Sequence, residues 1–200
     1  MKTKTSFLAA LAALLFGLSG CASESPDETS SPDASPAASP TGSPAEAVET
    51  ETCTNTTSGY SIEYPENWTI STGEFACRWA DPEPFVVAPG TEGPSTAIMA
   101  FASPESFDTV VNGTFDELFY ETRLREDTMI MDRRAIRFEV AATGEGLGES
   151  GTLSYGYIID KEGRGFQIST EQNRGDTRYE EDKRALEEAV KTLKFLPPEE

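Results

Sequence analysis

From residue 60 onward, hydrophobic and polar positions alternate along much of the chain. Tyr60, Ile62 and Tyr64 are separated by polar residues and followed by Pro65, a pattern that predicts a strand with one buried face. The same pattern predicts further strands at Trp68 to Ile70, Phe75 to Ala80, Pro84 to Val87, Thr96 to Phe101, Met129 to Met131, Arg134 to Val140, Leu153 to Ile159 and Phe166 to Ile168. Turns are predicted at Asp132-Arg133 and from Asp160 to Gly163.

Two segments have the spacing of helices instead. Thr114 and Glu117 resemble a capping box, and the apolar residues that follow predict a helix to about Arg125. A second helix is predicted from Thr177 to Lys194. Its apolar stripe consists of Tyr179, Leu186, Ala189, Val190 and Leu193. Hairpin-connected strands with one inserted and one terminal helix predict an α+β fold, with an antiparallel sheet of about six to eight strands flanked by helices.

The first twenty residues have the features of a secretory signal. Lys2 and Lys4 precede an apolar run from Phe7 to Leu18, which is shorter than the roughly 20 residues of a spanning helix. The sequence Leu18-Ser19-Gly20-Cys21 is similar to a lipobox, in which the cysteine sulfur receives lipid and cleavage makes Cys21 the N-terminus. We therefore predict a lipoprotein signal peptide at residues 1–20 and attachment to the extracytoplasmic face of the cell membrane through Cys21. The alternative is an ordinary signal peptide with a chance cysteine.

Residues 21–52 predict a tether rather than a folded segment. Ser, Pro, Ala, Thr, Glu and Asp dominate it, and Val48 is its only branched aliphatic residue. Such a composition cannot bury enough apolar surface to offset its ordering entropy. Seven acidic and no basic residues extend the chain by repulsion, to an end-to-end distance of about 30 to 95 Å. One globular domain is expected at residues 53–200.

Charge limits the choice of partners. The chain has 35 acidic and 16 basic residues, and loss of the two lysines of the leader would bring its net charge from −19 to −21. There is no basic surface for nucleic acid. Anionic lipid headgroups would repel the domain, so contact with the membrane is expected only through the lipid on Cys21. The acidic surface serves solubility or, alternatively, collects cations.

Few residues suggest chemistry. The chain has no histidine, which excludes Ser-His-Asp catalysis and imidazole metal ligands. Cys53 and Cys77 are an even pair in an exported domain and predict a disulfide, although a reactive thiol pair is the alternative. No set of catalytic, cofactor-binding or metal-ligating residues is predicted.

Three weaker candidates remain. Asp81, Glu83 and Glu92 occupy a loop that could bind Ca²⁺ weakly, and residues 171–176 come nearest to a calcium-binding loop, but neither segment has the required ligand spacing. Four glycines between residues 143 and 151 suggest a mobile loop. They do not predict a phosphate-binding loop, because they precede a strand and lie among glutamates. Trp68 and Trp79 are interpreted as core residues or, alternatively, as a platform for a ligand such as a sugar.

The segment from Gly59 to Trp68 (GYSIEYPENW) resembles the opening of PsbP-like domains. The hairpin from Asp132 to Ala135 and the terminal helix running into Leu193-Lys194-Phe195 fit the same layout, so the resemblance covers residues 57–197. It implies an antiparallel sheet between helices and a non-enzymatic accessory or binding role, often on surface lipoproteins of actinobacteria. It does not imply the photosystem role or the ion sites of plant members, because the matching positions are core residues.

Three functions are therefore considered. The first is a non-catalytic binding module of the cell envelope, whose partner is an envelope protein or an apolar ligand. The second is a hydrolase with carboxylates alone, which needs two carboxyl groups about 5–10 Å apart in a cleft. The third is a structural envelope component with no small ligand.

Overall fold

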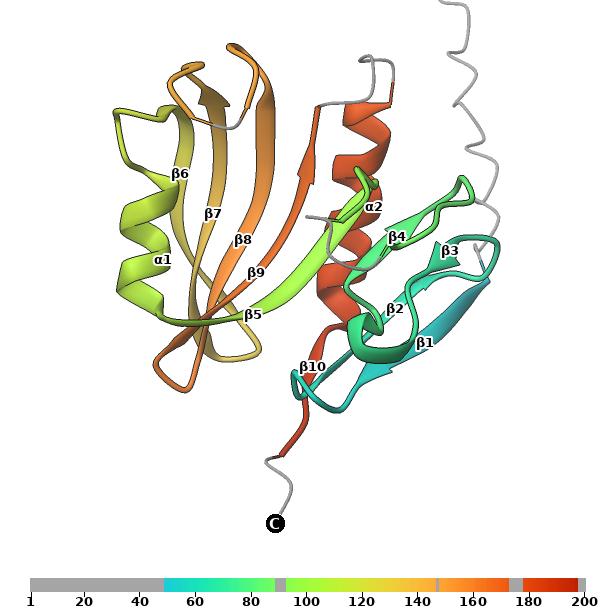
Figure 1. Ribbon diagram of the computed structural model, residues 1–200. Helices are drawn as coiled ribbons and strands as arrows, with labels where there is room; N and C mark the ends of the chain where they lie inside the picture. The colour runs from blue at the N-terminus through green and yellow to red at the C-terminus, as the bar shows by residue number, and fades with distance from the viewer. Residues whose placement is uncertain (1–48, 89–92, 147, 173–177, 198–200) are drawn as a thin grey trace, which may run out of the picture. The chain divides into compact units, whose positions relative to one another are not determined.

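Ten strands and two α-helices make up the part of the chain that the computed structural model describes, residues 49–88, 93–146, 148–172 and 178–197 (Figure 1). The strands are β1 (Thr50–Asn55), β2 (Tyr60–Pro65), β3 (Thr69–Ile70), β4 (Trp79–Asp81), β5 (Ile98–Ser106), β6 (Tyr120–Ile130), β7 (Arg133–Ala142), β8 (Leu153–Lys161), β9 (Arg164–Glu171) and β10 (Lys194–Phe195). The helices are α1 (Phe107–Thr114) and α2 (Tyr179–Thr192), with a 3-10 helix at Gly73–Phe75. The predicted signal peptide, Cys21 and most of the predicted tether lie outside the described residues.

The strands form two antiparallel sheets. Seven strands pair in the order β3-β4-β5-β9-β8-β7-β6, and a smaller sheet has the order β1-β2-β10. β1 begins at Thr50, so the small sheet includes the last three residues of the segment predicted as a tether. The predicted α+β class with an antiparallel sheet is confirmed.

The large sheet buries both of its faces, because alternate residues of a strand point to opposite sides. On one face, Phe107 and Val111 of α1 pack over Ile136, Phe138 and Ile158. The other face is covered by α2 and the small sheet (Figure 1). Each fully buried aromatic or branched side chain contributes about 1.5–3 kcal/mol. The predicted sheet with helices on both sides is therefore the arrangement of the fold.

The helix predicted from Thr114 to Arg125 is wrong. The helix of this region is α1, which lies earlier and is capped by Ser106, whose Oγ accepts a hydrogen bond from the Thr109 amide (3.1 Å). The Thr114 hydroxyl donates to the Val110 carbonyl (3.0 Å), so it contacts the end of a helix rather than its beginning. The residues from Tyr120 onward form β6, an edge strand with charged residues on both faces, and that composition hides the alternation.

Smaller differences concern strand limits. The strand predicted from Phe75 to Ala80 is mostly the end of the 3-10 helix and a turn, since β4 begins at Trp79. Residues 84–87 form no strand. The β6–β7 hairpin is confirmed, but its turn is Met131-Asp132, with both φ angles left-handed at 50° and 59°. The terminal helix is confirmed as α2.

The predicted disulfide is present. It joins Cys53 of β1 to Cys77, which lies just before β4, and the Cα atoms are 5.6 Å apart. The bond therefore links the small sheet to the connection between β3 and β4 of the large sheet.

Candidate binding cleft

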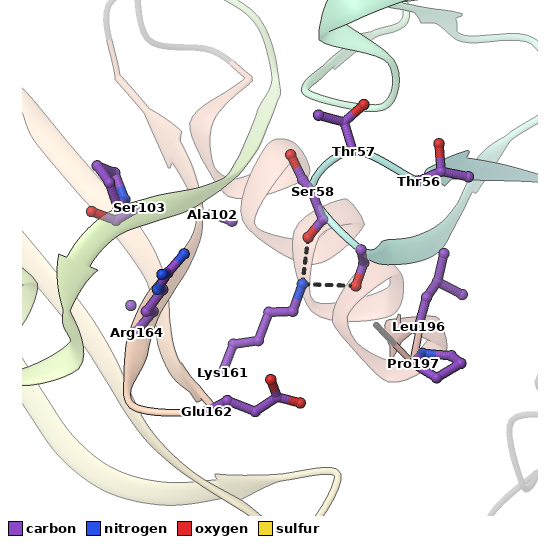
Figure 2. Close-up of a pocket in the computed structure, with 13 residues that line it drawn as sticks. Thr56, Thr57, Ser58, Ala102, Ser103, Lys161, Glu162, Arg164, Leu196 and Pro197 are labelled. Carbon is purple, nitrogen blue, oxygen red and sulfur yellow. Dashed lines mark hydrogen bonds between the residues drawn. The ribbon is translucent and has the colours of Figure 1, made fainter. Parts of the chain in front are cut away.

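A cleft of about 750 Å³ lies where the β1–β2 turn, β5, the β8–β9 turn and the chain after β10 meet (Figure 2). It is lined by residues 56–59, 102–104, 161, 162, 164, 165, 196 and 197. Ligand sites in proteins commonly have volumes of about 300–1,000 Å³. Because its lining comes from four distant parts of the chain, the cleft exists only in the folded protein.

The β1–β2 turn forms one wall of the cleft. The buried Asn55 side chain donates from Nδ2 to the Ala76 carbonyl (2.7 Å) and accepts at Oδ1 from the Ser58 amide (2.7 Å). Gly59 follows with a left-handed φ of 63°, and a β-carbon there would lie 2.7 Å from Lys161 Nζ. This position favours glycine for its backbone conformation, and a larger residue would also displace the end of the Lys161 side chain.

The β8–β9 hairpin contributes the charged groups. Lys161 and Arg164 are direct partners in the ladder, so their side chains project from the same face of the sheet. Between them Glu162 and Gly163 form the turn, with left-handed φ angles of 57° and 84°. Asp160 fixes this turn by accepting a hydrogen bond from the Gly163 amide (2.7 Å).

A bulge in β5 forms the opposite wall. β5 pairs with β9 at Ala102 and again at Ser106, so residues 103–105 stand opposite Gly165 alone. The strand bends at such a bulge, and bulges are frequent beside functional sites. Gly165 keeps α1 close to this wall, since a β-carbon would lie 2.6 Å from Cγ2 of Val110.

The Lys161 ammonium crosses the cleft to the turn. Nζ donates to the carbonyl oxygens of Ser58 and Gly59, the latter at 2.9 Å, as Figure 2 shows. An ammonium has three N–H donors, so two of them hold the turn and a third remains for another acceptor.

Other charges surround this ammonium. Burial lowers the pKa of Lys161, and Arg133 and Arg164 lower it further, against the opposite effect of Glu162. The Arg133 guanidinium and the Lys161 ammonium both lie over the Phe195 ring, at 5.1 and 5.4 Å from its centroid. Three cations therefore interact at one end of a strongly acidic protein.

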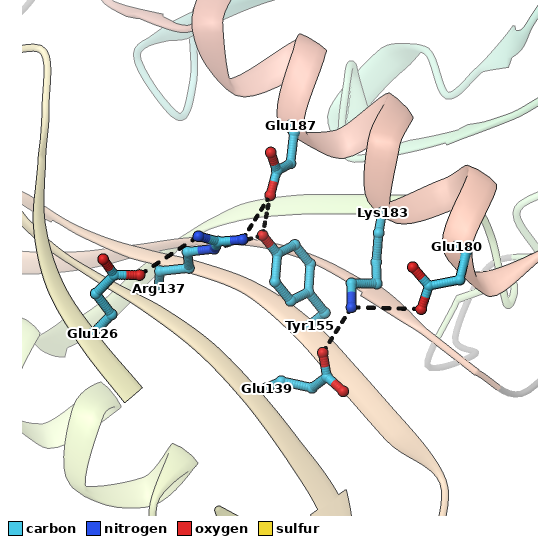
Figure 3. Close-up of polar contacts among 7 residues, drawn as sticks. All are labelled: Glu126, Arg137, Glu139, Tyr155, Glu180, Lys183 and Glu187. Atoms are coloured by element: carbon cyan, nitrogen blue, oxygen red, sulfur yellow. Dashed lines mark hydrogen bonds and ion pairs between the residues drawn. The ribbon is translucent and has the colours of Figure 1, made fainter. Parts of the chain in front are cut away.

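A second polar cluster lies between the large sheet and α2 (Figure 3). Its members are Glu126, Arg137, Glu139, Tyr155, Glu180, Lys183 and Glu187. Arg137 donates to the Tyr155 hydroxyl (2.8 Å) and pairs with Glu187 (3.2 Å), while Lys183 pairs with Glu139 (2.8 Å). Burial and the hydrogen bond to Glu187 raise the pKa of Tyr155. Each charge of this cluster has an opposite partner within it, which fits a role in holding α2 on the sheet.

Of the candidate calcium ligands in the loop from Asp81 to Glu92, the structure describes Asp81 and Glu83, and other groups engage both. Asp81 is buried, and its two carboxylate oxygens accept hydrogen bonds from the amides of Glu83 and Ala97, both at 2.7 Å. Glu83 pairs with Arg178 (3.2 Å). Glu92 and residues 173–176 lie outside the described part of the chain. Within that part, no group of three His, Cys, Asp or Glu residues could hold a metal ion.

The remaining candidates are structural or lie elsewhere. Trp79 is buried, and Trp68 packs partly buried against the main core, as expected for core residues. The glycine-rich segment joins β7 to β8, away from the cleft lining. In the described ranges no helix is long and apolar enough to cross a membrane.

The sequence pattern does not identify Lys161 and Arg164 as site residues: Lys161 falls inside the predicted turn from Asp160 to Gly163, and Arg164 is not singled out. The signal that could have found them is the scarcity of basic residues, because residues 53–200 contain 14 basic and 28 acidic ones. Two cations paired across a turn are unusual in such a chain. The bulge and the β1–β2 turn that complete the cleft left no comparable signal.

Comparison with known proteins finds similarity among solved structures, where 11 chains match. No protein-family model matches the sequence, and no curated protein matches it. Among solved structures, the chain is similar to the solution structure of cyanobacterial PsbP (CyanoP) from Synechocystis sp. PCC 6803. The sequence identity is 12% and the TM-score 0.43, and the match covers 78% of this chain and 99% of that chain.

Proposed function

We propose that this chain is a lipid-anchored protein of the cell envelope, whose folded domain is a non-catalytic binding module that takes a polar ligand in the Lys161 cleft. The observation that carries the proposal is the cleft itself. Hydroxyl groups, an ammonium and a guanidinium converge in a space large enough for a small molecule.

The character of the lining favours binding over hydrolysis. Glu162 is the only carboxylate among the described residues that line the cleft, whereas a carboxylate-only hydrolase needs two across the scissile bond. Thr57 and Ser103 offer hydroxyl groups on opposite walls. The cleft thus supplies groups that orient a polar ligand. We therefore propose a polar small molecule as the partner, in place of the apolar ligand expected from the sequence.

The anchor rests on the sequence. The apolar run before Leu18-Ser19-Gly20-Cys21 supports export and lipid attachment, and the acidic segment after it supports a spacer between the bilayer and the domain. A basic envelope protein is the second partner that the charge favours. Its association with the acidic domain should slow as salt is raised, because screening shortens the range of attraction.

Two experiments test the proposal. Labelled palmitate should enter the wild-type protein in cells but not Cys21→Ser, and equal labelling of both would contradict the anchor. A photoreactive amino acid at Thr57, in the cleft, should form adducts in cells that the same group at Arg123, on the exposed edge strand β6, does not form. Identical adducts from both positions, or none from Thr57, would contradict binding in the cleft.

A further inference from the structure

The Lys161 cleft combines positive charge with hydroxyl donors in a domain whose overall charge is strongly negative. Residues 53–200 contain twice as many acidic as basic residues. Yet Lys161 and Arg164 both line this cleft, and Arg133 interacts with Lys161 beside it. We infer that the ligand of the cleft carries a phosphate group, which Arg164 and Lys161 bind from one wall and hydroxyl groups bind from the others. This inference rests on the proposed binding function.

Positive charge is concentrated at this cleft. Arg133, Lys161 and Arg164 repel one another. Burial is the main cause of the lowered pKa of Lys161, and the two arginines lower it further against the opposite effect of Glu162. An anion between these groups would relieve the repulsion and form charge-assisted hydrogen bonds, which are about twice as strong as neutral ones.

Both cations of the lining can donate hydrogen bonds to an anion. Lys161 Nζ donates two of its three N–H groups to the Ser58 and Gly59 carbonyls. These hydrogen bonds fix the position of the ammonium without neutralising its charge. Arg164 is exposed, and no ion pair with it is found in the described part of the chain. A guanidinium presents a planar fork that matches two oxygens of a phosphate.

The distribution of donors around the cleft favours a tetrahedral anion. Residues with hydrogen-bond donors line the cleft on three elements: Thr57 on the β1–β2 turn, Ser103 on the β5 bulge, and the two cations on the β8–β9 hairpin (Figure 2). A tetrahedral phosphate accepts hydrogen bonds from several sides, whereas one planar guanidinium fork already satisfies a carboxylate. The Glu162 carboxylate, which would repel an anion, points away from Arg164 in Figure 2.

The size of the cleft indicates how the phosphate is presented. A volume of about 750 Å³ greatly exceeds that of a free phosphate ion. The phosphate is therefore expected as part of a larger group, either a soluble phosphate ester or a phospholipid headgroup. The same cations would bind both.

The test is an NMR titration of the purified full chain at constant chloride concentration. Inorganic phosphate should shift the amide signals of Ser58, Gly59 and Ser103, with a dissociation constant of about 1 mM. Arg164→Gln should weaken this binding by about ten- to a hundredfold, since a hydrogen bond to a charged group is lost. Arg123→Gln removes an exposed arginine from β6 and should leave binding unchanged.

Two further probes identify the source of the phosphate. Tighter binding of glycerol 3-phosphate than of inorganic phosphate indicates a soluble ester. Binding only to vesicles that contain phosphatidylglycerol, and not to phosphatidylcholine vesicles, indicates a lipid headgroup. Each result supports the inference if Arg164→Gln abolishes it.

A phosphate concentration of about 50 mM is far above the expected dissociation constant. The inference is overturned if it shifts none of the three amide signals. Equal weakening by Arg164→Gln and Arg123→Gln would overturn it too, because it would show unspecific attraction. A phosphate-free molecule captured from cells by the probe at Thr57 would refute the phosphate while leaving the binding function intact.

Discussion

Replacing Cys53 and Cys77 by alanine removes a bond whose contribution can be worked out from the fold. The two cysteines are 24 positions apart, so the disulfide closes a loop of 25 residues. The chain-entropy relation gives about 3.5 kcal/mol of stabilisation for a loop of that length. For a domain of this size, this loss corresponds to a fall in melting temperature of about 7–14 °C.

Urea denaturation followed by circular dichroism measures this loss. Reduced wild-type protein is the matched control, because it lacks the bond but keeps both sulfur atoms. We expect it to lose most of the same free energy, and the alanine variant to lose slightly more because Cys77 is buried. A loss below about 1 kcal/mol in both proteins would refute the entropic reasoning.

Three further predictions concern stability. Gly156→Ala should destabilise the domain by several kcal/mol, since its β-carbon would lie 2.2 Å from the Ile168 carbonyl oxygen. Gly113→Ala should instead stabilise it by about 0.5–1 kcal/mol, because a β-carbon there would meet no atom within 4 Å beyond its own helix backbone and chain neighbours. Equal urea midpoints for the two variants would contradict this. Met131→Asn should raise the free energy of unfolding by about 1 kcal/mol, because asparagine tolerates the left-handed conformation at φ 50° better than methionine, and an unchanged urea midpoint would argue against strain there. Burial raises the pKa of Tyr60 and Tyr64 above the unfolded value of 10.0. Their contribution to the free energy of unfolding should therefore be fully present below pH 10. Above pH 10 the free energy of unfolding should fall by about 1.4 kcal/mol per pH unit for each tyrosine. Equal urea midpoints at about pH 8 and pH 11 would show that these hydroxyls do not resist ionisation.

Elements with one buried and one exposed face could be predicted from the sequence. Tyr60, Ile62 and Tyr64 alternate because β2 buries one face in the core, and the apolar stripe of α2 follows its contact with the sheet. The edge strand β1 and all but the end of the edge strand β6 were not predicted, because solvent reaches much of both faces and their polar residues show no period of two. The helix predicted to begin at Thr114 was wrong because a threonine hydroxyl can form hydrogen bonds at either end of a helix. Only the tertiary structure decides which end it contacts.

The cleft could not be predicted in the same way. Its walls meet through pairings between segments about a hundred residues apart, such as Lys161 with the carbonyls of Ser58 and Gly59. Hydrophobic periodicity gives the faces of single elements but not which loops lie together at one end of a sheet. The Cys53–Cys77 bond was accessible because only two cysteines of the domain could pair.

The position of the disulfide affects how the domain would respond to mechanical force. If the chain is anchored as proposed, a pull from the membrane enters at Thr50, the first residue of β1. Such a force would peel β1 from β2 one hydrogen bond after another. The peeling stops at Cys53, where the bond passes the load to Cys77 and so to the chain entering β4. Tension therefore does not reach the rest of β1, the β1–β2 turn or the cleft wall that they support. A force on the tether would leave the geometry of the ligand site unchanged.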